Sequence, residues 1–290
     1  MEVSQARYFL AVTRAGHFTR AAERCNVSQP ALTSSIKKLE NELGAPLFHR
    51  DRKGPSLTVL GRMILPHAER LLESSVAVVD AAEDFGRLKN VPLRIGVLTT
   101  LGPSRLALAL EVFRTQAPEV ELEVHILEHR ELIRKLEEAE LEVAIGTNSL
   151  SDSPDWLIIQ ELYQENYVVL LPPGHALCAL ESISLAELDG LDYIDRLACE
   201  FRDLVVECCG LQNVRLYASY RTTSEAWIEC LVRAGIGFAF MPEFSVLSPD
   251  AITRPLLKPA LKRSISLLRS VDYTMSPAAQ LFWKTLKEYQ

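Results

Sequence analysis

The residues of this chain best suited to chemistry are four polar side chains spaced like one face of a helix. They are Gln29, Thr33, Ser34 and Lys37. Their amide, hydroxyl and amine groups exchange hydrogen bonds, and no bulky residue lies between them. A helix with such a face is what the major groove of DNA admits. The stretch therefore predicts direct contact with DNA bases and phosphates.

A second set of residues in the same stretch is apolar, with spacings of four, three and four, and predicts a buried back to the helix. This set is Leu32, Ile36, Leu39 and Leu43. An earlier helical pattern holds Ala21 and Ala22, which are small enough for a second helix to cross closely. The turn between the two ends at Ser28, a capping type, and Pro30 falls in the first turn, where a missing N–H costs little. The pattern predicts a helix-turn-helix, with an ordinary amphipathic helix pair as the alternative.

A basic hairpin is expected directly after this helix. Two strand-like pieces, 47–50 and 56–59, flank a turn that contains Gly and Pro. Arg50 and Arg52 lie at or near its tip, where they suit phosphate contacts that hold register without reading sequence. Residues 1–62 hold ten Lys and Arg against five Asp and Glu, although the whole chain carries a net charge of −7. A basic head on an acidic body indicates a nucleic-acid-binding module.

Residues 1–62 resemble the winged helix-turn-helix of LysR-type transcriptional regulators. The matching pieces are Ala21-Ala22, Val27 to Thr33, Ile36 to Glu40, Glu42 to Gly44, Pro46 to Arg50, Leu57-Thr58 and Gly61. The resemblance implies a sequence-specific regulator that binds double-stranded DNA, with RNA polymerase as a further partner. The DNA-contact residues then expected are Ser28, Gln29, Pro30, Thr33, Ser34, Lys37, Arg50 and Arg52.

Residues 60–88 carry apolar or small residues at alternating steps of four and three, the repeat of a helix that packs along a partner helix. They are Ile64, Ala68, Leu71, Ser75, Val78, Ala82 and Phe85. Such a helix would run roughly 40 Å, too long for a 60-residue domain to cover. Internal packing is one interpretation. We favour a dimerisation helix, because a two-fold DNA reader needs its recognition helices about one turn of DNA apart, and we expect a homodimer or homotetramer.

The remaining chain alternates strand and helix patterns. Strands expected at 92–98, 121–127 and 141–145, with helices at 103–116 and 131–139, form a βαβαβ unit and imply a parallel sheet. The expected later elements are strands at 157–163, 167–171, 191–195, 214–218, 236–241 and 264–268 and helices at 199–209, 224–234 and 277–289. The pattern resembles the two-lobed, periplasmic-binding-protein-like effector domain of the same family.

An α/β chain of three parts is therefore expected. The parts are a DNA-binding domain at 1–59, a linker or dimerisation helix at 60–89, and an effector-binding domain at 90–290 with lobe I at 90–161 and 266–290 and lobe II at 162–265. Ligands in such folds bind outside the carboxyl ends of strands, where hydroxyls and helix N-termini suit a small anion. Candidate effector residues are Thr99, Thr100, His129, Thr147, Cys199 and Thr223. Thr at a strand-to-helix junction is alternatively only a cap.

Cys199 and Cys208 resemble the reactive pair of the peroxide-sensing members of that family, which share their nine-residue spacing. Arg202 and Asp203 between them also resemble that subgroup, whereas Ala198 replaces its His and His129 replaces a Thr. A helix start near Arg202 would favour the Cys199 thiolate. Nine residues along a helix rise ~13 Å, so a disulfide would require that helix to unravel. Redox sensing and idle thiols both remain open.

No catalytic motif is present: Gly-x-Ser-x-Gly, Walker, His-Glu-x-x-His and Cys-x-x-Cys patterns are all absent, and the six His lack metal-ligand spacing. We expect no enzyme, catalytic residue, cofactor or metal. No apolar run approaches the ~20 residues of a membrane helix, and the first residues show no export leader. A cytoplasmic protein with reduced thiols and no membrane contact follows. The alternative function is a solute-binding or enzyme-like α/β protein whose helix-turn-helix makes protein contacts, but the basic head favours DNA.

Overall fold

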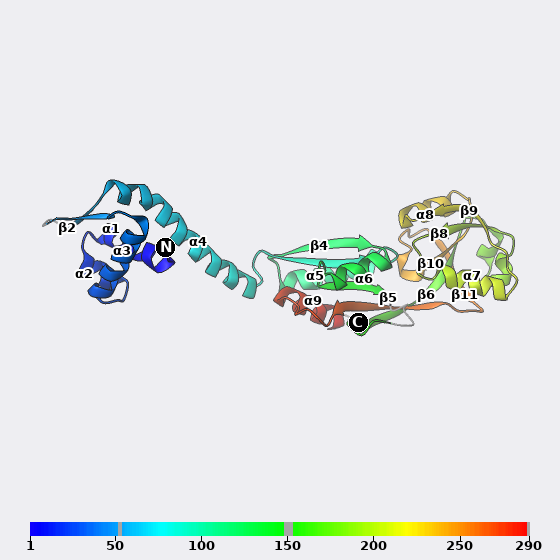
Figure 1. The fold of residues 1–290 in the computed structure, drawn as a ribbon. Helices are drawn as coiled ribbons and strands as arrows, with labels where there is room; N and C mark the ends of the chain where they lie inside the picture. The colour runs from blue at the N-terminus through cyan, green and yellow to red at the C-terminus, as the bar shows by residue number, and fades with distance from the viewer. Residues whose placement is uncertain (52–53, 148–152, 289–290) are drawn as a thin grey trace. The chain divides into compact units, whose positions relative to one another are not determined.

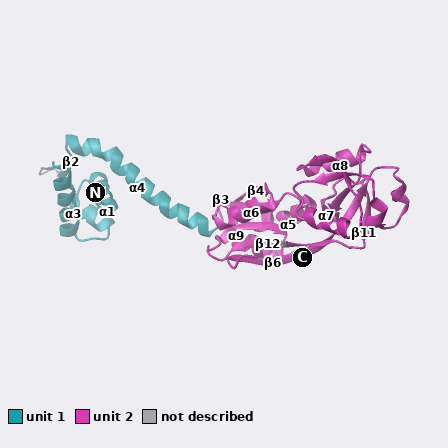
Figure 2. Cartoon of the chain, turned by 45° about the vertical axis from the view of Figure 1, so that its right-hand side comes forward, with its two compact units in different colours: residues 1–87 teal, residues 88–290 magenta. Residues whose placement is uncertain are grey.

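The computed structural model describes residues 1–51, 54–147 and 153–288 of the 290-residue chain. They form two compact units, Met1–Arg87 and Leu88–Gln290 (Figures 1 and 2). Within the described residues, no helix combines the length and the apolar character that crossing a membrane requires.

The N-terminal unit is a helical domain with a small hairpin. Its elements are α1 (Val3–Ala15), α2 (Phe18–Arg24), α3 (Gln29–Leu43), β1 (Phe48–Asp51), β2 (Gly54–Leu57) and α4 (Val59–Gly86). The predicted buried back of α3 is confirmed, because Leu32, Ile36 and Leu39 are fully buried. Ala21 and Ala22 on α2 lie in the same core. Sequence reasoning did not specify α1, although its Phe9 is a central member of this core.

The hairpin ends earlier than predicted, and α4 begins where a strand was expected. Thr58 caps α4 by accepting a hydrogen bond from the Gly61 backbone N–H at 3.0 Å. Val59 is therefore helical, which corrects the expected strand at 56–59. The backbone just before β1 passes close to Gly61 of α4, since a Cβ added to Gly61 would lie 2.3 Å from the Leu47 carbonyl oxygen.

The first lobe of the C-terminal unit is a sheet covered by helices. Its elements are β3 (Val91–Leu98), α5 (Pro103–Gln116), β4 (Val120–Leu127), α6 (His129–Glu137), β5 (Val143–Thr147) and α9 (Pro277–Glu288). β3 pairs in parallel with both β4 and β5, so the predicted parallel unit is confirmed. Phe113 of α5 and Phe282 of α9 meet edge to face at 5.2 Å and join the last helix to this lobe.

Two long strands continue from the first lobe into the second, β6 (Leu157–Leu171) and β12 (Lys262–Ser270). β12 pairs with the first part of β6, and β10 (Ala239–Pro242) and β11 (Ile252–Leu257) pair with the rest. The sheet order is β4-β3-β5-β12-β6-β11-β7, with β7 at Ile183–Ser184. The break expected between residues 163 and 167 is therefore wrong. Polar residues interrupt the apolar pattern there, but Gln164, Glu165 and Asn166 remain paired with β12.

The second lobe adds a separate pair of parallel strands with helices around it. Its other elements are β8 (Asp192–Arg196), α7 (Arg202–Leu211), β9 (Tyr217–Thr222), α8 (Glu225–Arg233) and the 3-10 turns η1 (Ala176–Ala179), η2 (Leu185–Leu188) and η3 (Glu243–Ser245). The helix expected from Cys199 begins three residues later, because Cys199 accepts a turn hydrogen bond from Arg202 N–H at 3.1 Å. The strand expected at 236–241 begins at Ala239, after Gly237 passes close to the Asp192 carbonyl.

Candidate functional site

The exposed face of α3 carries most of the predicted DNA-contact residues. Gln29, Ser34 and Lys37 are exposed on it, and so are Ser28 and Pro30 at its start. The Ser28 side chain also caps the helix, accepting from the Ala31 N–H at 3.3 Å. These side chains form one solvent-facing polar surface at the N-terminal part of α3.

Thr33 departs from this expectation. Its hydroxyl oxygen is buried and has no hydrogen-bond partner in the described structure, so it does not present a polar group to solvent in this conformation. Arg50 lies in β1 opposite Pro55, and Arg52 falls outside the described residues.

Helix α4 uses its apolar residues in two different ways. Ala68 is buried, and Ile64 and Leu71 pack against the core of the N-terminal unit, so this part of the predicted repeat serves internal packing. Beyond it the apolar residues are bare, with Val78 71% and Phe85 47% exposed. Only the second half of the repeat is therefore open to a partner helix.

A buried guanidinium, Arg263, lies at the centre of the cluster that joins the two lobes of the C-terminal unit. Its Nη1 donates to Thr100 Oγ1 at 2.8 Å and to the Glu200 carboxylate, and its Nη2 donates to the Thr100 carbonyl at 2.9 Å. Thr100 Oγ1 in turn donates to Glu200 Oε2 at 2.8 Å. A carboxylate of the chain itself therefore occupies the anion position between Thr100 and Arg263.

A second carboxylate lies on the other side of Arg263. Glu165 Oε1 accepts from Arg263 Nε at 2.8 Å, and both side chains are fully buried. One cation therefore faces two carboxylates, and the cluster carries a net negative charge. Burial raises the pKa of Glu200, but the Arg263 charge and its hydrogen bonds outweigh burial and hold that pKa below its usual range.

The backbones of the two lobes also meet beside this cluster. Ser245 Oγ donates to the Thr100 carbonyl at 2.7 Å. A Cβ on Gly102 would lie 1.8 Å from the Phe244 carbonyl oxygen, so only glycine fits there. The Arg105 guanidinium lies over the Phe244 ring at 4.0 Å.

Cys199 lies next to Glu200, in the turn before α7. Its Sγ is 3.5 Å from the Tyr167 hydroxyl and 3.6 Å from Arg196 Nη1. Burial raises the pKa of this thiol, and the Arg196 charge only partly offsets that effect. Arg202 does not contact the thiol, because it forms two hydrogen bonds with Asp195 at 2.7 and 2.8 Å. The expected helix-start activation by Arg202 is therefore wrong.

The remaining predicted effector residues differ in burial and in whether they lie near Glu200. His129 begins α6, and both of its ring nitrogens are buried without a partner among the described residues. Burial lowers the pKa of His129, against the raising effect of the nearby Glu200 charge. Thr147 is buried with its hydroxyl unpartnered in the described structure, Thr99 is half-buried, and Thr223 is exposed. Thr100, Cys199 and His129 are thus associated with Glu200, whereas no described contact brings the other three to it.

Sequence reasoning missed the three residues at the centre of the cluster, Arg263, Glu165 and Glu200. The sequence carries no clear local signal for them, because Glu165 lies between polar Gln164 and Asn166 and Arg263 lies between Lys262 and Ser264. In the part of the chain that the structure describes, no group of three or more His, Cys, Asp or Glu side chains could hold a metal ion. All six cysteines are free thiols.

We predict that Cys199 reacts slowly with thiol reagents. In the native protein at pH 7.5 it should be alkylated at least about tenfold more slowly than the exposed Cys230, because Cys199 is only half-exposed and its thiol pKa is raised. Mass spectrometry of timed samples measures both rates. Denatured protein, in which the two rates should converge, is the control. Equal rates in the native protein would contradict the prediction.

Comparison with known proteins covers both units. Residues 3–62 match the family model described as bacterial regulatory helix-turn-helix protein, lysR family, and residues 87–290 match the LysR substrate binding domain. The chain is 26% identical over 276 residues to a hydrogen peroxide-inducible genes activator of Haemophilus influenzae, covering 92% of this chain and 90% of that protein. It is 27% identical over 275 residues to the DNA-binding transcriptional dual regulator OxyR of Escherichia coli K12, covering 92% and 89%. A solved full-length OxyR variant from Pseudomonas aeruginosa is 26% identical, with a TM-score of 0.67 over 99% of both chains.

Proposed function

The chain belongs to the LysR family of DNA-binding transcriptional regulators, and we propose that its C-terminal unit controls DNA binding in response to a small carboxylate. It is a regulator and not an enzyme. In this proposal residues 1–59 form the DNA-binding domain, and residues 60–89 form the linker and dimerisation helix. Residues 90–290 form the effector-binding domain. Its first lobe comprises 90–161 and 266–290, and its second lobe comprises 162–265. Because its target is chromosomal DNA, we place the chain in the cytoplasm, with RNA polymerase as a further partner.

DNA contact is proposed for the exposed polar surface of α3. Gln29, Ser34 and Lys37 have open side chains, and Ser28 and Pro30 lie at the exposed start of the helix. An amide such as that of Gln29 pairs with adenine, whereas an amine contacts phosphate or guanine. The hairpin residues Arg50 and Arg52 are proposed to contact the phosphate backbone of the DNA. Thr33 is proposed to contact DNA through its hydroxyl, which must rotate outward to do so.

Replacing Gln29 with Ala should weaken binding to the native operator by about 1–3 kcal/mol and relax its sequence preference. Lys37→Ala should instead weaken all DNA alike and flatten the salt dependence. Footprinting on the chain's own upstream region, followed by titration at several salt concentrations, measures both. Gln280→Ala, at an exposed position of α9, is the matched control. Unchanged affinity and preference in the first two variants would remove α3 from the interface.

Assembly as a homodimer or homotetramer is proposed from the bare apolar residues. Val76, Val78, Val79 and Phe85 of α4 are all about half exposed or more. In the C-terminal unit β4 is an edge strand with Ile126 60% exposed, a surface that pairing would cover.

The position of the Glu200 carboxylate supports the proposed effector class. It occupies a place lined by the Thr100 hydroxyl and the Arg263 guanidinium. A small carboxylate that took this place would keep both hydrogen bonds and release Glu200. Because Glu200 belongs to the turn before α7, its release would move that turn and the second lobe.

A panel of small mono- and dicarboxylates, titrated by calorimetry into the full chain, tests this effector site. At least one should bind, and Thr100→Val should weaken it at least about tenfold, the loss expected for a hydrogen bond to a charged group. Thr115→Val on the exposed part of α5 should bind as the wild type does. Failure of every carboxylate, or equal affinity in Thr100→Val, would refute the site.

Oxidant sensing at Cys199 and Cys208 is the second candidate, supported by their spacing and by the Arg196 and Tyr167 contacts of Cys199. The activator of Haemophilus influenzae to which the chain is similar is named for hydrogen peroxide. Two features argue against oxidant sensing: the thiol pKa of Cys199 is raised, and Ala198 stands where the peroxide-sensing members have a His. Rapid native alkylation of Cys199 would favour this candidate.

A further inference from the structure

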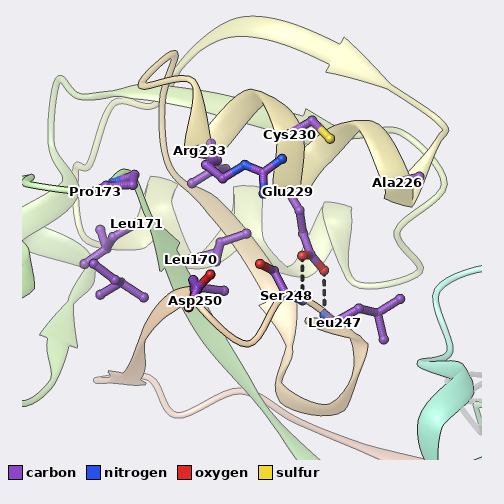
Figure 3. Close-up of a pocket in the computed structure, with 13 residues that line it drawn as sticks. Leu170, Leu171, Pro173, Ala226, Glu229, Cys230, Arg233, Leu247, Ser248 and Asp250 are labelled. Atoms are coloured by element: carbon purple, nitrogen blue, oxygen red, sulfur yellow. Dashed lines mark hydrogen bonds between the residues drawn. The ribbon is translucent and has the colours of Figure 1, made fainter.

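A pocket lies in the second lobe of the C-terminal unit, beside β6 and α8. It encloses about 430 Å³ between the end of β6, helix α8 and the segment 247–252 (Figure 3). Buried Leu170, Leu171 and Val232 contribute to its lining. None of the residues proposed for the effector site lines it. A volume of this size with an apolar lining is typical of small-molecule pockets.

The rim of the pocket is held in place by one acidic residue of α8. Both oxygens of the Glu229 carboxylate accept backbone hydrogen bonds, from Leu247 at 2.6 Å and from Ser248 at 2.9 Å (Figure 3). The segment opposite α8 is therefore fixed before any ligand arrives, and Glu229 is already engaged.

Two charges of opposite sign remain free in the same pocket. Arg233 of α8 and Asp250 of the opposite segment both line it, and neither has an ion pair within the described residues. Figure 3 shows the Arg233 guanidinium on one side of the Leu170 side chain and the Asp250 carboxylate on the other, with the Ser248 hydroxyl beside them. A ligand in contact with Leu170 thus meets a cation and an anion.

We propose that this pocket binds an α-amino acid with an apolar side chain. The ligand's carboxylate pairs with Arg233, its ammonium group pairs with Asp250, and its side chain lies on Leu170 and Val232. A simple carboxylate would leave Asp250 unpaired, and a simple amine would leave Arg233 unpaired. Charge complementarity with one cation and one anion therefore selects a zwitterion.

The proposal is tested by calorimetric titration of L-leucine and L-phenylalanine into the full chain. Both should bind, and two analogues of leucine should bind at least about tenfold more weakly. These are 4-methylpentanoate, which lacks the ammonium group, and leucinamide, which lacks the carboxylate. Ala226→Trp, which places a large ring at an exposed position of the lining, should abolish binding of leucine, phenylalanine and leucinamide.

Charge variants separate the two ends of the ligand. Arg233→Gln should weaken leucine at least about tenfold but leave leucinamide unchanged, whereas Asp250→Asn should weaken leucine but leave 4-methylpentanoate unchanged. Both side chains are exposed, so these variants should fold normally. Arg215→Gln and Asp203→Asn, at exposed positions outside the pocket, are the controls.

Three results would overturn the proposal. The first is that neither amino acid binds the wild type at about 10 mM. The second is that the Arg233 and Asp250 variants bind leucine as the wild type does. The third is that Thr100→Val abolishes leucine binding. The last result would assign the amino acid to the site between the lobes. Loss of carboxylate binding in Thr100→Val with intact leucine binding supports two separate sites.

Discussion

Replacement of Arg263 by Met should destabilise the C-terminal unit by about 3–5 kcal/mol at neutral pH, the usual cost of removing one partner from a buried ion pair. The guanidinium is fully buried and is the direct partner of both Glu165 and Glu200. Without it, two carboxylates remain buried with no compensating cation. The loss should therefore exceed that of an ordinary exposed ion pair by several-fold.

Denaturant unfolding followed by tryptophan fluorescence measures this loss directly, because Trp156, Trp227 and Trp283 all lie in the C-terminal unit. Arg269→Met is the matched control on the same strand, since Arg269 is half-buried and donates to the Ser270 carbonyl. A deficit below about 1 kcal/mol, similar to that of the control, would mean that the carboxylates find other partners.

The deficit should also shrink as the pH falls. In the wild type the pKa of Glu200 is held below its ordinary value, so its stabilisation is present above the unfolded pKa and is lost as pH falls through the folded pKa. Without Arg263, burial alone would raise the pKa of Glu200, and protonation would relieve the buried charge. We therefore expect the gap between Arg263→Met and wild type to narrow from pH 7.5 to pH 5.5, and a constant gap would contradict this cause.

Val78→Asp should break the contact between α4 helices, lower the oligomeric state of the protein and weaken its binding to a full two-fold operator at least about a hundredfold, since one head then binds without its partner. Val78 is 71% exposed within one chain, so the substitution should leave that chain folded. Sedimentation and operator titration at micromolar protein measure both effects. Leu71→Asp is a poorer test, because Leu71 packs on its own core.

Ser74→Asp is the control for this experiment, as Ser74 is exposed on α4 outside the apolar repeat. It should sediment as the wild type does. A wild-type chain that sediments as a monomer, or a Val78→Asp chain that sediments and binds the operator as the wild type does, would rule out α4 as a contact between chains.

Local patterns predicted the N-terminal unit better than the site between the lobes. The buried stripe of α3 and the Ser28 cap depend on neighbours within a few residues, so spacing alone predicted them. The contact of Arg263 with Glu165 joins residues 98 positions apart, and no local pattern encodes such a pairing. Cys199 shows the same limit. Helix α7 begins three residues later than the sequence pattern predicted, and the cation beside the thiol is Arg196 instead of the expected Arg202.

Helix α4 is one uninterrupted element whose first half belongs to the DNA-binding core and whose second half is bare. Operator architecture is therefore partly a property of the helix length. Inserting seven residues after Ser74 would add about 10 Å and turn the bare stripe by only about 20°, so the stripe would keep its facing while its distance from α3 grows. Inserting five residues would turn the stripe by about 140° and present charged residues at the seam. A change in the length of α4 would thus alter the separation of the two recognition helices without changing any residue of α3.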